Sequence, residues 1–285
     1  LKLAHGRPNS FLLESVEGGA SRGRYSIIGY DPDLIWRCRA GVAELNRDAH
    51  AAPFAFAPDA RPPLESLRAL IAESRMALPE GLPPMCGGLI GYLGYDMVRQ
   101  MERLPAKNSD ALGIPEAILG RPQLFAIFDN VTDLLTLAAP VYPREGITPA
   151  RAWEAAQTRL EEAEAALARP IPLAAPPVAL PPVPEPVSNF TREAFVAVVE
   201  RIKDYIRAGD AFQVVPSQRF SAPFALPPFS LYRALRRINP APFLVFMDLG
   251  GFSVVCSSPE ILVRLRDNTV TIRPLAGTRK RGATH

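Results

Sequence analysis

Cysteine is scarce in this sequence, and long apolar runs and dense basic stripes are missing. The three cysteines lie far apart, without a CxxC motif or Cys/His ligand spacing: Cys38, Cys86 and Cys256. A disulfide framework and a structural zinc site are therefore not expected, and a reduced, cytoplasmic protein fits best. No segment approaches the roughly 18 apolar residues of a membrane span. The formal net charge of +3 and the lack of a basic stripe argue against nucleic-acid binding.

Histidine is equally scarce. The three residues lie in a ragged terminus, in a loop and at the last position: His5, His50 and His285. None is placed by flanking structure as a general acid or base, and no GxSxG nucleophile motif is present. The carboxylates of the second half are isolated and do not form a magnesium site: Asp204, Asp210, Asp248, Glu260 and Asp267. For Glu260 we expect a structural hydrogen-bonding role instead.

The hydrophobic pattern predicts an α+β protein with mostly antiparallel sheet, because short strands alternate with tight turns. Helices are expected at four places, from the spacing of apolar residues and the end signals: 64–76, 149–169, 191–208 and 230–238. Strands are expected at nine: 11–16, 24–29, 123–128, 133–138, 211–220, 243–249, 252–256, 261–265 and 270–273. In helix 149–169 the apolar stripe consists of Trp153, Ala156, Leu160, Ala163 and Leu167.

A proline-rich stretch divides the chain. Residues 170–187 are dense in proline and nearly free of charge, so a semi-rigid, extended linker is predicted. The sequence thus predicts an N-terminal part, residues 1–169, and a second part, residues 188–285.

Two segments are candidate sites from their chemistry. The glycine cluster Gly87–Gly94 has the order GGxxGxxG rather than GxGxxG, so close backbone packing is favoured over a phosphate loop. Residues 273–282 combine Gly277, the Thr278 hydroxyl and four cations within nine residues. That combination suits a small polyanion such as a dicarboxylate, and the alternative is a solvated basic loop.

Several blocks, taken in order, resemble the chorismate-utilising enzymes, and within them the large subunits of anthranilate synthase. The blocks cover nearly the whole chain: Leu12-Leu13-Glu14-Ser15, Gly23-Arg24-Tyr25-Ser26, Gly94-Tyr95-Asp96, Ala208-Gly209-Asp210-Ala211-Phe212-Gln213, Asn239-Pro240-Ala241-Pro242-Phe243, Ser257-Ser258-Pro259-Glu260 and Pro274-Leu275-Ala276-Gly277-Thr278-Arg279. The resemblance implies two packed, mostly antiparallel sheets flanked by helices, a four-layer α/β/β/α fold. Residues 1–169 would be a regulatory region with the first part of the core, and residues 188–285 the first part of the chorismate-binding core.

The resemblance also implies a reaction. Ammonia from a glutamine amidotransferase partner adds to chorismate, the ring hydroxyl leaves, and elimination of pyruvate gives anthranilate. Relatives that make aminodeoxychorismate typically carry a lysine where this sequence has Ala276. A methyl group cannot act as nucleophile or base, which favours anthranilate synthase. Gly277 and Thr278 correspond to substrate contacts.

Tryptophan is the expected feedback inhibitor. The matching residues are Ser15, Pro242, Phe243 and Leu244, beside Glu14. An acidic group and a hydroxyl would suit the amino-acid head and apolar walls the indole. Phe243 and Leu244 replace the family's usual tyrosine and methionine.

The resemblance places the catalytic histidine and the magnesium ligands beyond residue 285, so no catalytic or metal residue is expected in this chain, and the chain alone is expected to be inactive. Two alternatives stay open. One is an aminodeoxychorismate synthase, and the other is an inactive module that senses tryptophan.

Overall fold

The computed structural model describes residues 2–15, 23–105, 108–171, 184–275 and 277. Its contacts divide the chain into two compact units, Leu1–Pro172 with Pro228–His285, and Leu173–Pro227. The predicted linker, residues 170–187, falls largely outside the described residues. Within the described part, no helix is both long and apolar enough to cross a membrane.

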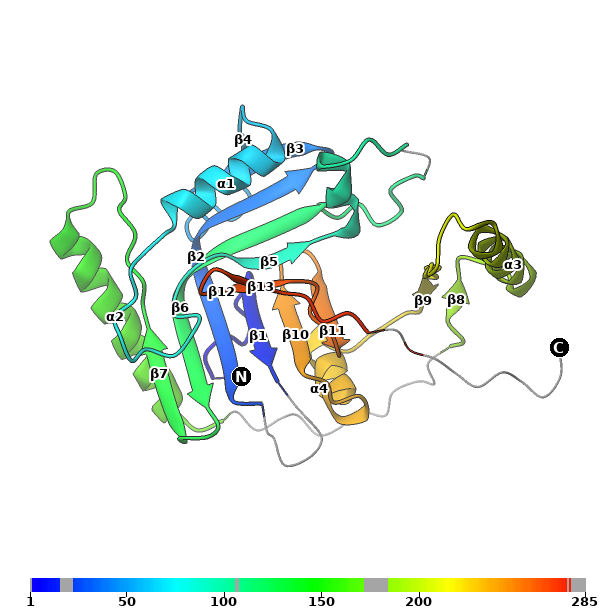
Figure 1. The fold of residues 1–285 in the computed structure, drawn as a ribbon. Coiled ribbons are helices and arrows are strands. Elements are labelled where there is room, and N and C mark those ends of the chain that lie inside the picture. Colours follow the sequence, from blue (N-terminus) through cyan, green and yellow to red (C-terminus); the bar gives the residue numbers. More distant parts are fainter. Residues whose placement is uncertain (1, 16–22, 106–107, 172–183, 276, 278–285) are drawn as a thin grey trace. The chain divides into compact units, whose positions relative to one another are not determined.

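A nine-stranded antiparallel sheet forms the framework of the first unit (Figure 1). Its strands are β1 (Ser10–Glu14), β2 (Tyr25–Arg39), β3 (Val42–Asn46), β4 (Ala57–Pro58), β5 (Ile90–Leu93), β6 (Ala117–Asp129), β7 (Leu134–Ala138), β10 (Phe243–Asp248) and β11 (Ser253–Ser258). A separate two-stranded ladder joins β12 (Arg264–Arg266) to β13 (Thr269–Thr271). The predicted α+β class with mostly antiparallel strands is confirmed. Of the expected packed sheets, the described residues contain this one large sheet.

Two long strands, β2 and β6, pair with each other in the middle of the sheet, and each also pairs with two shorter strands. The first half of β2 pairs with β1 and its second half with β3, while β6 pairs with β5 at one end and with β7 at the other. The β2–β6 register shifts between Pro32 and Leu34. Asp31, just before the shift, has a φ of 51°. Such an irregularity bends a strand. The two halves of each long strand can therefore pair with different neighbouring strands.

Three helices cover apolar surface of the sheet. Helix α1 (Pro63–Glu73) packs Leu67 and Leu70 over Trp36, which is fully buried and donates its indole N–H to Ser66 at 2.9 Å. Helix α2 (Pro149–Ala168) packs Ala163 near Tyr30 of β2. Helix α4 (Pro228–Ile238) lies against β10 and β11. These helices position the sheet strands whose ends form the candidate sites.

The second unit contains α3 (Arg192–Ala208) and a short ladder between β8 (Val187–Ser188) and β9 (Phe220–Ser221). Both predicted ends of α3 are confirmed. The Thr191 hydroxyl caps the helix by accepting from the Ala194 N–H at 3.2 Å, and Gly209 ends it at a φ of 85°. The predicted strand 211–220 is wrong except at its last residue, because only Phe220–Ser221 pair there and Pro216 has no N–H to donate.

Other expectations differ in detail. Helix α1 ends at Glu73 rather than at residue 76, and β12 begins three residues later than predicted. Trp153 does not belong to the buried stripe of α2, since 63% of it is exposed while Ala156 is 4% exposed. Asp267 and Asn268 form one of the tight turns that the strand pattern predicts: both residues have positive φ, of 48° and 57°, as a two-residue hairpin turn requires.

Candidate functional site

The sheet brings two distant predicted segments together at the end of β1. The antiparallel register pairs Leu13 with Val245 and Glu14 with Leu244. Ser15 follows directly after β1, and Pro242 directly precedes β10. The residues predicted to bind an amino acid, Ser15 and 242–244, therefore meet at one end of two neighbouring strands, more than 200 residues apart in sequence.

The side chains of this cluster point to different faces of the sheet. Leu244 is fully buried, whereas Phe243 is 41% exposed. Successive residues of a strand alternate between the faces, so only one of the two can line a given pocket. Phe243 is the one available to a ligand, because Leu244 has no exposed surface. Ser15 and Pro242 are half-buried.

Helix α4 supplies two partners to the Glu14 carboxylate on the face where Leu244 is buried. The Tyr232 hydroxyl donates to Glu14 Oε2 at 2.5 Å, and Arg236 Nε lies 3.1 Å from the same oxygen. Tyr232 is 1% exposed and stacks on Phe229, with ring centroids 5.6 Å apart. Burial and, to a smaller extent, the Glu14 acceptor raise the pKa of the Tyr232 hydroxyl far above its usual value. Sequence patterns did not indicate this cluster.

The segment Gly23–Ser26 lies directly beside the segment Leu12–Ser15. A Cβ placed on Gly23 would lie 2.2 Å from the Ser15 Cβ and 2.2 Å from its carbonyl oxygen. Real Cβ atoms do not approach so closely, so only glycine allows the chain to return beside Ser15. This contact explains in physical terms why Leu12–Ser15 and Gly23–Ser26 occur together.

A second candidate segment is held by Glu260. Its Oε1 accepts a hydrogen bond from the Leu275 N–H at 2.9 Å. The hydrogen-bonding role predicted for Glu260 is thereby confirmed, and the blocks Ser257–Glu260 and Pro274–Leu275 become neighbours. Gly277 lies two residues beyond this contact, and a Cβ placed on it would meet no described atom within 4 Å. Ala276 and Thr278 lie outside the described residues, so the substrate role of Gly277 and Thr278 stays a prediction.

No magnesium site exists among the residues that the structure describes, because no three His, Cys, Asp or Glu side chains converge there. His5 and His50 are exposed, and His285 is outside the described part. No step of a reaction is therefore assigned to a metal held by these residues.

The glycine cluster packs against β6, as the sequence favoured. A Cβ on Gly91 would lie 1.9 Å from the Ile118 carbonyl oxygen, and one on Gly94 would lie 2.8 Å from that of Glu116. Glycine is needed here for backbone contact between β5 and β6, which accounts for these two positions without a phosphate.

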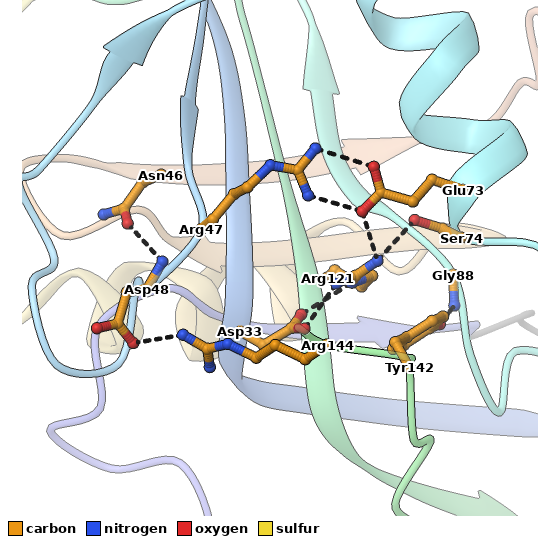
Figure 2. A network of polar contacts seen from close by, with 10 residues as sticks. All are labelled: Asp33, Asn46, Arg47, Asp48, Glu73, Ser74, Gly88, Arg121, Tyr142 and Arg144. Carbon is orange, nitrogen blue, oxygen red and sulfur yellow. Dashed lines mark hydrogen bonds and ion pairs between the residues drawn. The ribbon is translucent and has the colours of Figure 1, made fainter. Parts of the chain in front are cut away.

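A buried polar network lies at the bend of β2 and β6 (Figure 2). Arg121 is 5% exposed and donates two hydrogen bonds to the Asp33 carboxylate, of 2.9 and 2.7 Å. It also donates to Ser74 at 3.2 Å and lies 4.1 Å above the Tyr142 ring. Sequence reasoning missed this network. An arginine inside an otherwise apolar strand was the available signal, because a buried cation requires a partner.

The comparisons with known proteins identify the family. The family described as chorismate binding enzyme matches residues 16–285. The chain is 53% identical over 284 residues to anthranilate synthase component 1 of Cereibacter sphaeroides, and 42% identical over 289 residues to that of Pseudomonas putida. Each alignment covers 100% of this chain and 57% of the relative.

A solved structure agrees with these relatives. Anthranilate synthase component I from Streptococcus pneumoniae matches with a TM-score of 0.72 and 28% identity, over 90% of this chain and 54% of that one. This chain belongs to the chorismate binding enzymes. The three relatives named above are anthranilate synthase component 1 or component I, of which this chain spans little more than half.

Proposed function

We propose that this chain is part of an anthranilate synthase large subunit, a lyase. The full-length enzyme would convert chorismate and ammonia into anthranilate, pyruvate and water, the first committed step of tryptophan biosynthesis. The observation that carries the proposal is the alignment of the whole chain with anthranilate synthase component 1 at 53% identity. Ala276 supports it, because a lysine there would favour other products.

The residues of this chain would bind rather than transform the substrate. Gly277 and Thr278 offer a backbone N–H and a hydroxyl, which bind a carboxylate of chorismate. The Glu260 carboxylate positions the segment by holding the Leu275 N–H. Magnesium would support the reaction from ligands outside the described residues, and a glutamine amidotransferase subunit would deliver the ammonia. Reduced cysteines fit a cytoplasmic location.

The end of β1 would bind tryptophan as an inhibitor. Ser15 would hydrogen-bond the amino-acid head, and Phe243 with Pro242 would provide apolar wall for the indole. Leu244, fully buried in β10, would support the site from within the sheet rather than touch the ligand. The support is geometric: the β1–β10 register places these residues together from opposite parts of the sequence.

Anthranilate fluorescence tests the activity. The full-length polypeptide is mixed with chorismate, magnesium and an ammonium salt, and the product is identified by chromatography. Anthranilate is expected. Aminodeoxychorismate as the product would identify the other synthase, and failure to consume chorismate while tryptophan still binds would identify a sensing module.

Calorimetric titration with tryptophan tests the inhibitor site. Ser15→Ala removes one hydrogen bond to the ligand and should weaken binding by about 10- to 100-fold, since a hydrogen bond to a charged group contributes about 1.5–3 kcal/mol. Ser253→Ala, on the far end of β11, is the matched control. Unchanged affinity in Ser15→Ala would contradict this location for the inhibitor.

A further inference from the structure

A pocket opens beside the polar network of Figure 2, apart from the ends of β1 and β10 and from the segment that Glu260 holds. It has a volume of about 400 Å³ and lies between α2, the loop before it and the bend of β2 and β6. Its polar lining includes Asp33, Asp48, Arg144, Arg151 and Arg159. A pocket of this size suits a small molecule, for which volumes of about 300–1,000 Å³ are typical.

One wall of the pocket is fixed by the buried network. The Asp33 carboxylate is 11% exposed and already bound by Arg121 through two hydrogen bonds. Tyr142 accepts a hydrogen bond from the Gly88 N–H at 3.1 Å and lies under the Arg121 guanidinium. This wall is rigid and its charges are matched, so Asp33 does not repel an incoming anion as an isolated carboxylate would.

The pocket is also lined by two arginines that have no bonded partner within the described part of the chain. Asp48 is matched by Arg144 at 3.2 Å, but the guanidinium groups of Arg151 and Arg159 make no ion pair and no hydrogen bond with any residue that the structure describes. The Arg159 Nε atom is shielded from solvent and has no acceptor. A buried donor without an acceptor is costly, and a bound anion would supply one.

The remaining lining is apolar or weakly polar, and it completes the chemistry of the ligand. It consists of the apolar residues Pro140, Val141, Ile147, Ala152 and Ala155, together with His50, Gln123 and Gly146. The carboxylates of Asp33, Asp31 and Glu162 lie near enough to act on Arg159, but none of them bonds to it. A ligand with two negative charges would give each guanidinium group a direct partner, and the apolar residues would contact its carbon body. Arginine forks match phosphate and carboxylate oxygens equally well.

We propose that this pocket binds a small organic dianion, a phosphate monoester or a dicarboxylate, through Arg151 and Arg159. Nothing in the proposed reaction uses these two residues. The site would therefore exist whether or not the chain acts on chorismate.

Isothermal titration calorimetry on the full-length polypeptide tests the proposal with phenyl phosphate and phthalate, and with phenol as the uncharged probe. At least one dianion should bind, and phenol should not. Arg151→Gln and Arg159→Gln should each weaken binding by about tenfold or more, the loss expected for one charged hydrogen bond. The better-binding dianion distinguishes the phosphate from the dicarboxylate.

Arg68→Gln is the matched control, because it removes the same charge from an exposed position of α1. Its affinity should stay within about twofold of the parent. The proposal is overturned if neither dianion binds at millimolar concentration, if phenol binds equally well, or if Arg68→Gln weakens binding as much as the pocket variants. Arg151 is exposed, so Arg151→Gln decides the matter if Arg159→Gln unfolds.

Discussion

Single glycines in the glycine cluster set how closely β5 approaches β6. Gly91→Ala would drive a methyl group into the Ile118 carbonyl, 1.9 Å away, and backbone cannot rotate aside as a side chain does. We expect a loss of about 1–3 kcal/mol in the free energy of unfolding, the range for overpacked sites. Chemical denaturation measures it.

Gly251→Ala is the control for this prediction. Gly251 lies in the turn before β11, has nothing within 4 Å of its Cβ position and does not have a positive φ. Its substitution should leave the free energy of unfolding within about 0.5 kcal/mol of the parent. Equal losses in the two variants would show that crowding against Ile118 is not the reason for glycine at position 91.

Tyr30 and Tyr92 are among the buried tyrosines that make stability depend on alkaline pH. Burial raises the pKa of Tyr30 to about 12 and that of Tyr92 to about 12. The unfolded value is about 10. Because the folded pKa is the higher one, the stabilisation is fully present below pH 10 and is lost as the pH rises from 10 towards 12.

Tyr92→Phe should therefore flatten the dependence of the unfolding free energy on pH between 10 and 12, as measured by urea denaturation at each pH. Tyr95→Phe provides the comparison, because Tyr95 is 91% exposed and should leave the slope unchanged. An unaltered slope in Tyr92→Phe would mean that the hydroxyl ionises as readily in the folded protein as in the unfolded one.

At the scale of elements, α4 is fastened to β1 through the Glu14 carboxylate. Tyr232→Phe removes the hydrogen bond to Glu14 Oε2. The Glu14 carboxylate then keeps only Arg236, which is 46% exposed, as a side-chain partner among the described residues. We expect a loss of about 1–3 kcal/mol in the free energy of unfolding, since the acceptor is charged and mostly buried. Tryptophan affinity should fall as well, because Ser15 is the next residue.

The measurement is thermal or urea unfolding, paired with tryptophan calorimetry. Tyr95→Phe again removes a phenolic hydroxyl where it makes no such contact, and it should change neither quantity. A Tyr232→Phe variant as stable as the parent would mean that aromatic packing with Phe229 and Phe246, rather than the hydrogen bond, fastens α4.

The helices and strands that could be predicted correctly are those whose sequence signals act on neighbouring residues. Helix α3 was predicted at both ends because Thr191 and Gly209 act on their immediate neighbours. The strand at 211–220 was wrong because alternation of apolar residues does not reveal whether a partner strand is present. The exposed Trp153 was misplaced for a similar reason: a helical stripe fixes which residues share a side, but not how far the sheet extends beneath them.

In the candidate site, too, some residues could be predicted from local sequence and others could not. Its residues 12–15 and 239–243 could be singled out by resemblance, and Glu260 by its flanking residues. The contacts of Glu14 with Tyr232 and Arg236 join positions more than 200 residues apart, and no local pattern encodes such a pairing. The Arg121 network likewise depends on a strand bend that only the folded sheet specifies.

At the scale of the whole molecule, the pairing of β1 with β10 should be a late event in folding. The β6–β7 hairpin closes over four residues, whereas β1 and β10 are joined across more than 200. Loop closure costs more entropy at longer separations, so distant pairs form after near ones. Pulse-labelling hydrogen exchange during refolding should show amides of 125–129 protected before those amides of 10–14 that face β10 rather than β2. Simultaneous protection would contradict this order.

The same pairing has a consequence while the chain is being synthesised. Residues 10–14 leave the ribosome early, but their partner, 243–248, is translated more than 200 residues later, which takes on the order of ten seconds or more at about 5–20 residues per second. Throughout that interval one hydrogen-bonding edge of β1 has no native neighbour. Nascent chains on adjacent ribosomes of one message expose the same edge, so β1 is the place where cotranslational mispairing between copies would begin.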